Sequence, residues 1–250
     1  MAVPRPSLRL VHTSDVHLTP RAPESGGASA EEAAFRTVIE TVIAEEADAL
    51  LIAGDLFDSN RVSARTLSFV EAELGRLSCP VVLIPGNHDC YDEESVYRQF
   101  DMRSIGANVH PLTAEGGEVV SFAELQLRVW GKGLVDHVPS NRPLAGVPPR
   151  DGDHWFVGMA HGFFVEGRAE LRSSLITPEE VATSGFDYLA LGHVHVFRDV
   201  SQGETRAFYP GSPLIPHAPD RGSIAIVTLD PEMGISVEGR QIMVRSEETE

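Results

Sequence analysis

The stretch Ala49-Leu50-Leu51-Ile52-Ala53-Gly54-Asp55 decides the fold that we predict. Its five apolar residues have the length of a buried strand, and the glycine and carboxylate that follow mark the end of that strand. Two other apolar strands, Leu8–His12 and Val81–Ile84, also run directly into polar residues. All three strands therefore carry polar side chains at their carboxyl ends.

A helix is predicted in each of the two connections between these strands. Glu31–Ala47 has apolar residues at helical spacing, and Ser29 with Glu32 can form a capping box at its start. Ala64–Leu77 has a similar apolar face, while the prolines and glycines of Pro20–Ala30 indicate a flexible loop. The order strand, helix, strand, helix, strand predicts a parallel sheet, in which ligand sites lie outside the carboxyl ends of the strands.

The second half of the chain is richer in strands. We predict short strands at Val119–Ser121, Leu125–Trp130, Trp155–Ala160, Tyr188–Leu191, Phe197–Val200, Arg206–Tyr209, Ser223–Leu229 and Ile235–Arg240. Four prolines make Asp136–Asp153 a long loop. With neither a repeat nor a linker to divide it, the chain is predicted to form one α/β domain over residues 1–250, with two mixed β-sheets packed face to face, outer helices and a short acidic tail at 245–250.

The composition restricts the partners and the compartment. A formal charge of −17 repels polyanions at long range, so the electrostatic footprint of a nucleic-acid-binding protein is missing. The apolar runs have strand length, which argues against a membrane span, and Met1–Ser7 lacks the apolar core of a signal peptide. Cys79 and Cys90 are too few for a disulfide framework and fit a reducing cytoplasm as small buried residues.

Five short polar motifs stand at the ends of predicted strands. They are Asp15-x-His17, Gly54-Asp55-x-x-Asp58, Gly86-Asn87-His88-Asp89, His161-Gly162 and Gly192-His193-x-His195. Residues i and i+2 of extended backbone point to the same side, so each x-spaced pair can reach one centre. Mixed carboxylate, amide and imidazole ligands suit divalent ions such as Mn²⁺, Fe²⁺ or Zn²⁺. Each motif alone is weak, but the five together predict a site for two divalent ions.

The remaining histidines have no such neighbours in the sequence. We interpret them as structural or surface residues: His12, His110, His137, His154 and His217. Arg61 follows the second motif and could clamp a substrate phosphate, although a solvated loop arginine is the alternative. For Asp89, stabilisation of its own loop is the expected role.

The order of these motifs resembles that of the calcineurin-like metallophosphoesterases. Within that superfamily, His12–Leu18, Ile52–Ser59 and Tyr209-Pro210-Gly211-Ser212-Pro213 are similar to the SbcD-type branch of DNA-repair exonucleases. The resemblance covers about residues 8–230. It implies a four-layer αββα sandwich of two mixed sheets flanked by helices, and hydrolysis of phosphate esters.

The resemblance also implies a role for each motif residue. The first metal would be held by Asp15, His17, Asp55 and His195, and the second by Asp55, Asn87, His161 and His193. A hydroxide bridging the two ions, for which Mn²⁺ is the first choice, would be the nucleophile. His88 is not needed as a ligand beside Asn87, so it can act as general acid toward the leaving oxygen, and Asp58 would orient it.

Three functions compete at this point. The first is hydrolysis of a small phosphomonoester or phosphodiester, the second is a compact DNA exonuclease, and the third is a scaffold that has lost catalysis. A scaffold would lack ligands, whereas every ligand position is filled here. SbcD-type nucleases continue into a capping domain and a region that docks an ATPase, but this chain ends soon after its last predicted strand. With its negative charge, this disfavours duplex DNA as substrate and predicts no ATPase partner.

Overall fold

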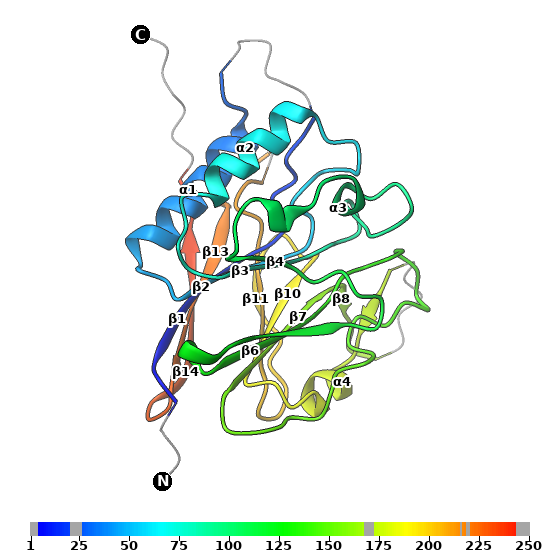
Figure 1. Ribbon diagram of the computed structural model, residues 1–250. Helices are drawn as coiled ribbons and strands as arrows, with labels where there is room; N and C mark the ends of the chain where they lie inside the picture. The colour runs from blue at the N-terminus through cyan, green and yellow to red at the C-terminus, as the bar shows by residue number, and fades with distance from the viewer. Residues whose placement is uncertain (1–4, 21–26, 168–172, 216, 219–220, 244–250) are drawn as a thin grey trace.

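A computed structural model shows two six-stranded sheets packed face to face (Figure 1). It describes residues 5–20, 27–167, 173–215, 217–218 and 221–243. Most of the predicted loop Pro20–Ala30 and the acidic tail 245–250 lie outside these residues. Within them, no helix has the length and the apolar composition that a bilayer crossing requires.

The first sheet contains the predicted parallel strands. In spatial order it consists of β14 (Gly234–Gln241), β13 (Ser223–Asp230), β1 (Leu8–Thr13), β2 (Ala49–Ala53), β3 (Val81–Ile84) and β4 (Val109–Pro111). Strands β1 to β4 run parallel to one another, and β13 and β14 add to the β1 edge in antiparallel fashion. The sheet is therefore mixed, as predicted.

Two helices cover the outer face of this sheet (Figure 1). α1 (Ala30–Ala44) begins with the predicted capping box, in which the Ser29 hydroxyl accepts from Glu32 N–H and the Glu32 carboxylate accepts from Ser29 N–H. α2 (Ala64–Leu74) begins at the cap residue Ser63 and ends before Gly75. Both helices end three residues earlier than predicted. At α2 the next residue is glycine, the poorest helix former after proline.

The second sheet is built from the later strands. In spatial order it consists of β11 (Phe197–Asp199), β12 (Arg206–Pro210), β10 (Tyr188–Gly192), β7 (Trp155–His161), β6 (Leu127–Lys132) and β5 (Glu118–Phe122). The four central strands are parallel and the two edge strands are antiparallel. β6 starts two residues later than predicted because residues Ala123–Leu125 form a 3₁₀ turn that ends at Gln126 with a φ of 46°.

The two sheets differ in what covers their outer faces. The inner faces share one apolar cluster, to which strands of both sheets contribute. The outer face of the second sheet is covered by α4 (Pro178–Thr183) and by Leu144 and Val147 of the long loop Asp136–Asp153. The fourth layer of the sandwich is therefore one short helix and a loop (Figure 1).

Several short elements were not predicted. They are α3 (Val96–Gln99), a 3₁₀ turn (Met102–Ser104), strand β4, the parallel pair β8 (Phe163–Phe164) and β9 (Leu175–Ile176), and α4. Each has too few residues to establish a helical or alternating pattern in the sequence.

The site is positioned where strands of both sheets end. Gly54 and Gly192 allow close approach there, because a Cβ on Gly54 would lie 2.3 Å from His161 Nδ1 and a Cβ on Gly192 would lie 1.9 Å from Ala53 O. Asp15 and Asp55 adopt positive φ angles of 55° and 53°, which are uncommon outside glycine. Such strain is concentrated at functional sites.

Candidate metal centre

All seven predicted ligands lie at strand ends of the two sheets. Asp15 and His17 follow β1, Asp55 follows β2, Asn87 follows β3, His161 ends β7, and His193 and His195 follow β10. The first sheet thus supplies the carboxylates and the amide, together with one imidazole, and the second sheet supplies three imidazoles.

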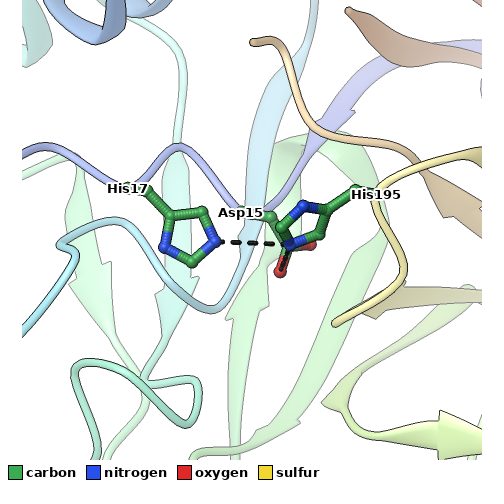
Figure 2. Close-up of side chains that lie close together, drawn as sticks. All are labelled: Asp15, His17 and His195. Carbon is green, nitrogen blue, oxygen red and sulfur yellow. Dashed lines mark hydrogen bonds and ion pairs between the residues drawn. The ribbon is translucent and has the colours of Figure 1, made fainter. Parts of the chain in front are cut away.

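One group of ligands consists of Asp15, His17 and His195, whose candidate ligand atoms lie within 4.8 Å of one another. His195 Nε2 is 3.4 Å from His17 Nε2 and 3.5 Å from Asp15 Oδ1 (Figure 2). Asp15 Oδ1 is buried and has no hydrogen-bond donor. A buried carboxylate oxygen without a donor is costly, and a cation shared with the two ring nitrogens would satisfy it. These residues fit a divalent ion.

The second group is centred on the amide oxygen of Asn87. His193 Nδ1 lies 2.9 Å and His161 Nε2 3.0 Å from Asn87 Oδ1. The other ring nitrogen of His161, Nδ1, donates to Ala53 O at 2.8 Å, so Nε2 is the atom that faces the centre. An amide oxygen and two imidazole nitrogens converge here, which is again a ligand set for a borderline divalent ion.

Asp55 joins the two groups. Its Oδ2 lies 3.3 Å from His161 Nε2, and its Oδ1 accepts from His88 N–H at 2.8 Å. It also forms a candidate metal cluster with His161 and with Asp15 of the first group. The buried Asp55 carboxylate therefore lies between Asp15 of the first group and His161 of the second, where it can serve both groups.

The buried charges of the site are strongly coupled. Burial opposes ionisation of Asp55, yet the neighbouring His161 lowers the pKa of this carboxyl well below its usual range. Burial likewise opposes the charged form of His161, but Asp55 and Asp15 outweigh it and raise the pKa of His161 to about 9. We therefore expect His161 to be an imidazolium at neutral pH in the metal-free protein. Its geometry agrees, since both ring nitrogens face acceptor oxygens.

We expect metal binding to displace this proton. In the metal-free protein, NMR titration of the histidine rings should show His161 protonated at pH 8 and titrating near its pKa of about 9. Loading with a diamagnetic divalent ion such as Zn²⁺ should make the ring neutral at the same pH, because a metal ligand must give up its proton. A His161 ring that titrates near the ordinary histidine pKa without metal would contradict this coupling.

His88 lies beside the ligands with one exposed face. Its Nδ1 donates to the backbone carbonyl of Asp58 at 3.0 Å, and its ring lies edge-on to His17 with centroids 4.6 Å apart. The Asp58 carboxylate is 3.7 Å from His88 Nδ1 and 3.5 Å from His17 Nδ1. Asp58 thus contacts His88 through its main chain. Its side chain lies slightly closer to the predicted ligand His17. The roles of His88 and Asp58 in catalysis stay predictions.

Asp89 connects two of the ligand loops. Its buried carboxylate accepts from Gly86 N–H at 2.7 Å, from Phe57 N–H at 3.1 Å and from Asp55 N–H at 3.3 Å. Tyr97 O–H adds a fourth hydrogen bond at 2.8 Å. Asp89 therefore fixes its own loop, and it also fixes the loop that carries Asp55. The part played by Tyr97 had no signal in the sequence.

The structure shows the surroundings of Arg61, the predicted phosphate clamp. Arg61 is exposed, and its role in phosphate binding stays a prediction. Arg65, four residues further along the chain, is bound to the Glu32 carboxylate by two hydrogen bonds.

Burial and then Asp92 raise the pKa of Cys90 to about 11, and burial also raises the pKa of Cys79. Neither cysteine forms a ready thiolate at neutral pH.

One histidine that we interpreted as structural or surface lies against the site. His137, from the loop Asp136–Asp153, packs edge-on against His193 with ring centroids 5.0 Å apart. Its Nε2 lies 2.8 Å from Ser173 Oγ. His12, in contrast, is a buried structural residue, with Nδ1 2.8 Å from Tyr188 OH across the two sheets. Neither His137 nor Ser173 belongs to a motif, so the sequence offered nothing to link them to His193.

Known proteins resemble this chain at two levels. In sequence, it is 26% identical to the uncharacterized metallophosphoesterase YhaO of Bacillus subtilis over 230 residues, which span 86% of this chain and 55% of that protein. It is 25% identical to the D subunit of the nuclease SbcCD from the same organism over 276 aligned positions, which span 96% of this chain and 70% of the relative. The chain thus spans about half the length of YhaO.

In structure, it resembles a dimetal phosphatase from Danio rerio with a TM-score of 0.55 and 14% identity, covering 95% of this chain and 99% of the other. The protein TT1561 of Thermus thermophilus gives a TM-score of 0.59 at 11% identity, over 94% and 99% of the two chains. These likenesses support the fold. The family model for calcineurin-like phosphoesterases matches residues 8–197, a range that contains all seven candidate ligands. The chain belongs to the calcineurin-like phosphoesterases.

Proposed function

We propose that the chain hydrolyses phosphate esters with two divalent ions held by the seven ligands at the strand ends. The observation that carries this proposal is the position of Asp55 between two groups of candidate ligands, together with the buried Asp15 Oδ1 that accepts no hydrogen bond in one of them. Membership of a family of phosphoesterases supports the reaction class. The mixed oxygen and nitrogen donors support Mn²⁺, with Fe²⁺ and Zn²⁺ as alternatives.

Each part of the site has a task in this reaction. Divalent ions bound here would lower the pKa of water and neutralise the charge that develops on the phosphoryl oxygens. Asp15 and Asp55 supply buried negative charge to hold the ions, and the backbone hydrogen bonds to Asp89 keep Asp55 in place. His88 has a ring nitrogen, Nε2, remote from its bond to Asp58 O, with which it can protonate the leaving oxygen.

We propose a small phosphodiester as the substrate, because the chain is strongly acidic and many of the arginines that the structure describes are paired with carboxylates. The net charge is −17. Many of the described arginines already contact carboxylates: Arg9, Arg36, Arg65, Arg76, Arg128, Arg142, Arg150 and Arg240. Binding to duplex DNA normally draws its affinity from free lysines and arginines on the phosphates.

The second candidate function is that of a compact DNA exonuclease. It is favoured by the similarity to the D subunit of the nuclease SbcCD, which extends over 96% of this chain. The metal centre alone could bind one phosphate at a DNA end. The charge of the chain argues for small substrates over processive digestion of a duplex.

These two functions can be separated on one preparation. With Mn²⁺, we expect hydrolysis of bis(p-nitrophenyl) phosphate and little digestion of linear duplex DNA at physiological salt. The reason is the weak affinity for a polyanion when phosphate contacts to lysine and arginine are few. Rates would be followed by p-nitrophenolate release and by gel analysis of the DNA. Asp55→Asn serves as the control for contaminating nucleases. Efficient DNA degradation by the wild type but not by this variant would favour the exonuclease.

A further inference from the structure

His193 is the candidate ligand whose ring is contacted from the outer layer of the fold. Its Nδ1 faces Asn87 Oδ1 at 2.9 Å, and its Nε2, on the opposite side of the ring, lies 3.4 Å from Ser173 Oγ. Ser173 in turn lies 2.8 Å from His137 Nε2. Two contacts in series therefore connect His193 Nε2, through Ser173, to His137 in the loop Asp136–Asp153.

The Ser173 hydroxyl, which joins these two contacts, can form hydrogen bonds both in the metal-free site and in the metal-bound site. Without metal, His193 Nδ1–H donates to Asn87, so Nε2 accepts from the Ser173 hydroxyl, which accepts from His137 Nε2–H. If Nδ1 were to coordinate an ion, the proton of His193 would sit on Nε2 and donate to Ser173 Oγ. The hydroxyl would then donate to His137 Nε2, and the proton of His137 would sit on its Nδ1. Because a hydroxyl both donates and accepts, the contacts of Ser173 with His193 and with His137 can be hydrogen bonds in either state.

Ring packing restricts His193 as well. His137 packs edge-on at 5.0 Å between centroids, His161 at 5.3 Å and Phe163 at 6.2 Å. The ring of the other second-group imidazole, His161, is held differently, by a hydrogen bond from Nδ1 to the backbone carbonyl of Ala53. In His193, the ring nitrogen that faces away from Asn87 is contacted by a side chain, Ser173, instead of a backbone carbonyl.

We propose that Ser173 and His137 are positioning residues for His193, which fix its tautomer and orientation as a ligand of the second ion. The proposal rests on the two-ion function given above. Metal-ligating histidines commonly donate their other N–H to such a partner, and loss of that partner typically weakens metal binding about 10- to 100-fold. The loop Asp136–Asp153, which carries His137, thereby takes part in metal binding although it supplies no ligand.

The test is a titration of metal-free protein with Mn²⁺, with free Mn²⁺ measured by EPR. The wild type should bind two ions. Ser173→Ala should bind one of them about 10- to 100-fold more weakly and keep the other unchanged. His137→Ala should weaken the same ion, and the double variant should be no worse than the more affected single variant, because the two residues act in series. Ser173→Thr keeps the hydroxyl and should restore binding.

Ser174→Ala is the matched control. The neighbouring hydroxyl, Ser174 Oγ, donates to Val138 O at 3.4 Å, so this variant removes a tether to the same loop without touching His193. It should bind both ions as the wild type does. Thermal unfolding of each metal-free variant shows whether its fold is intact.

Two outcomes separate this inference from the proposed function. If the wild type does not bind two ions, the two-ion function itself is wrong. If the wild type binds two ions and folded Ser173→Ala binds both equally well, the positioning role is wrong. Equal weakening in Ser173→Ala and Ser174→Ala would also overturn the role, since general loosening of the loop would then explain the loss.

Discussion

Asp55→Asn should reduce the proposed phosphodiesterase activity by at least about 10³-fold, because bound metal ions would supply several kcal/mol of transition-state stabilisation and each 1.36 kcal/mol is tenfold in rate. The substitution keeps the size of the side chain and an oxygen to accept from His88 N–H. It removes the charge of the carboxylate that lies between Asp15 of the first group and His161 of the second. Metal analysis of the variant should therefore show loss of at least one ion.

Asp48→Asn provides a matched control for this variant. Asp48 directly precedes β2, whereas Asp55 follows its end, and Asp48 Oδ2 accepts from Arg9 N–H at 2.7 Å. An asparagine there can keep that hydrogen bond, so both activity and metal content should be retained. Two tightly bound ions and normal turnover in Asp55→Asn would show that this carboxylate does not bridge the ions.

Asp55→Asn also has a consequence for His161 in the metal-free protein. Asp55 is the largest of the groups that raise the pKa of His161 to about 9. Without that charge, burial of the ring should lower the pKa toward or below its ordinary value. NMR titration of the histidine rings would detect the change. It would distinguish a loss of electrostatic coupling from a general loss of structure.

The strands that position the site could be predicted because each is an apolar run followed by polar residues. Ala49–Ala53 and Val81–Ile84 have the predicted bounds, and both are buried along their whole length. β4, in contrast, consists of only Val109–Pro111, and its proline at the sheet edge gave no sign of a strand. The pair β8 and β9 has two residues in each strand, which is too short for any periodicity.

The convergence of the seven candidate ligands could be predicted, because each stands in a short motif at a strand end and the ends of parallel strands meet at one edge. The supporting residues could not. Tyr97 donates to Asp89 across eight positions of sequence, and His137 reaches His193 from a loop that has no periodic pattern. Their place depends on how the short helix α3 and the loop Asp136–Asp153 pack in the fold, which local sequence does not encode. Candidate positioning residues are therefore found only once the fold is known.

His88→Asn should separate the chemistry of the leaving group from metal binding. The side chain lies beside the ligands, and its Nδ1 is occupied by Asp58 O, which leaves Nε2 for proton transfer. Removal of a general acid typically costs about 10²- to 10⁴-fold in rate. We expect a loss of this size on diesters with alkyl leaving groups, which need a proton to depart. On p-nitrophenyl esters the loss should be much smaller, because p-nitrophenolate leaves readily without a proton.

His110→Asn is the control for this comparison, because His110 lies on the edge strand β4 and packs against Phe122 away from the ligand clusters. It should leave both rates unchanged. On the proposed ligand assignment, His88→Asn should keep both metal ions, since Asn87 and His161 would hold the second ion without it. If alkyl and p-nitrophenyl esters lose the same factor, His88 does not donate the proton. If the ions are lost instead, His88 acts in metal binding, a role that its place beside His17 and Asp58 in a third candidate cluster would then explain.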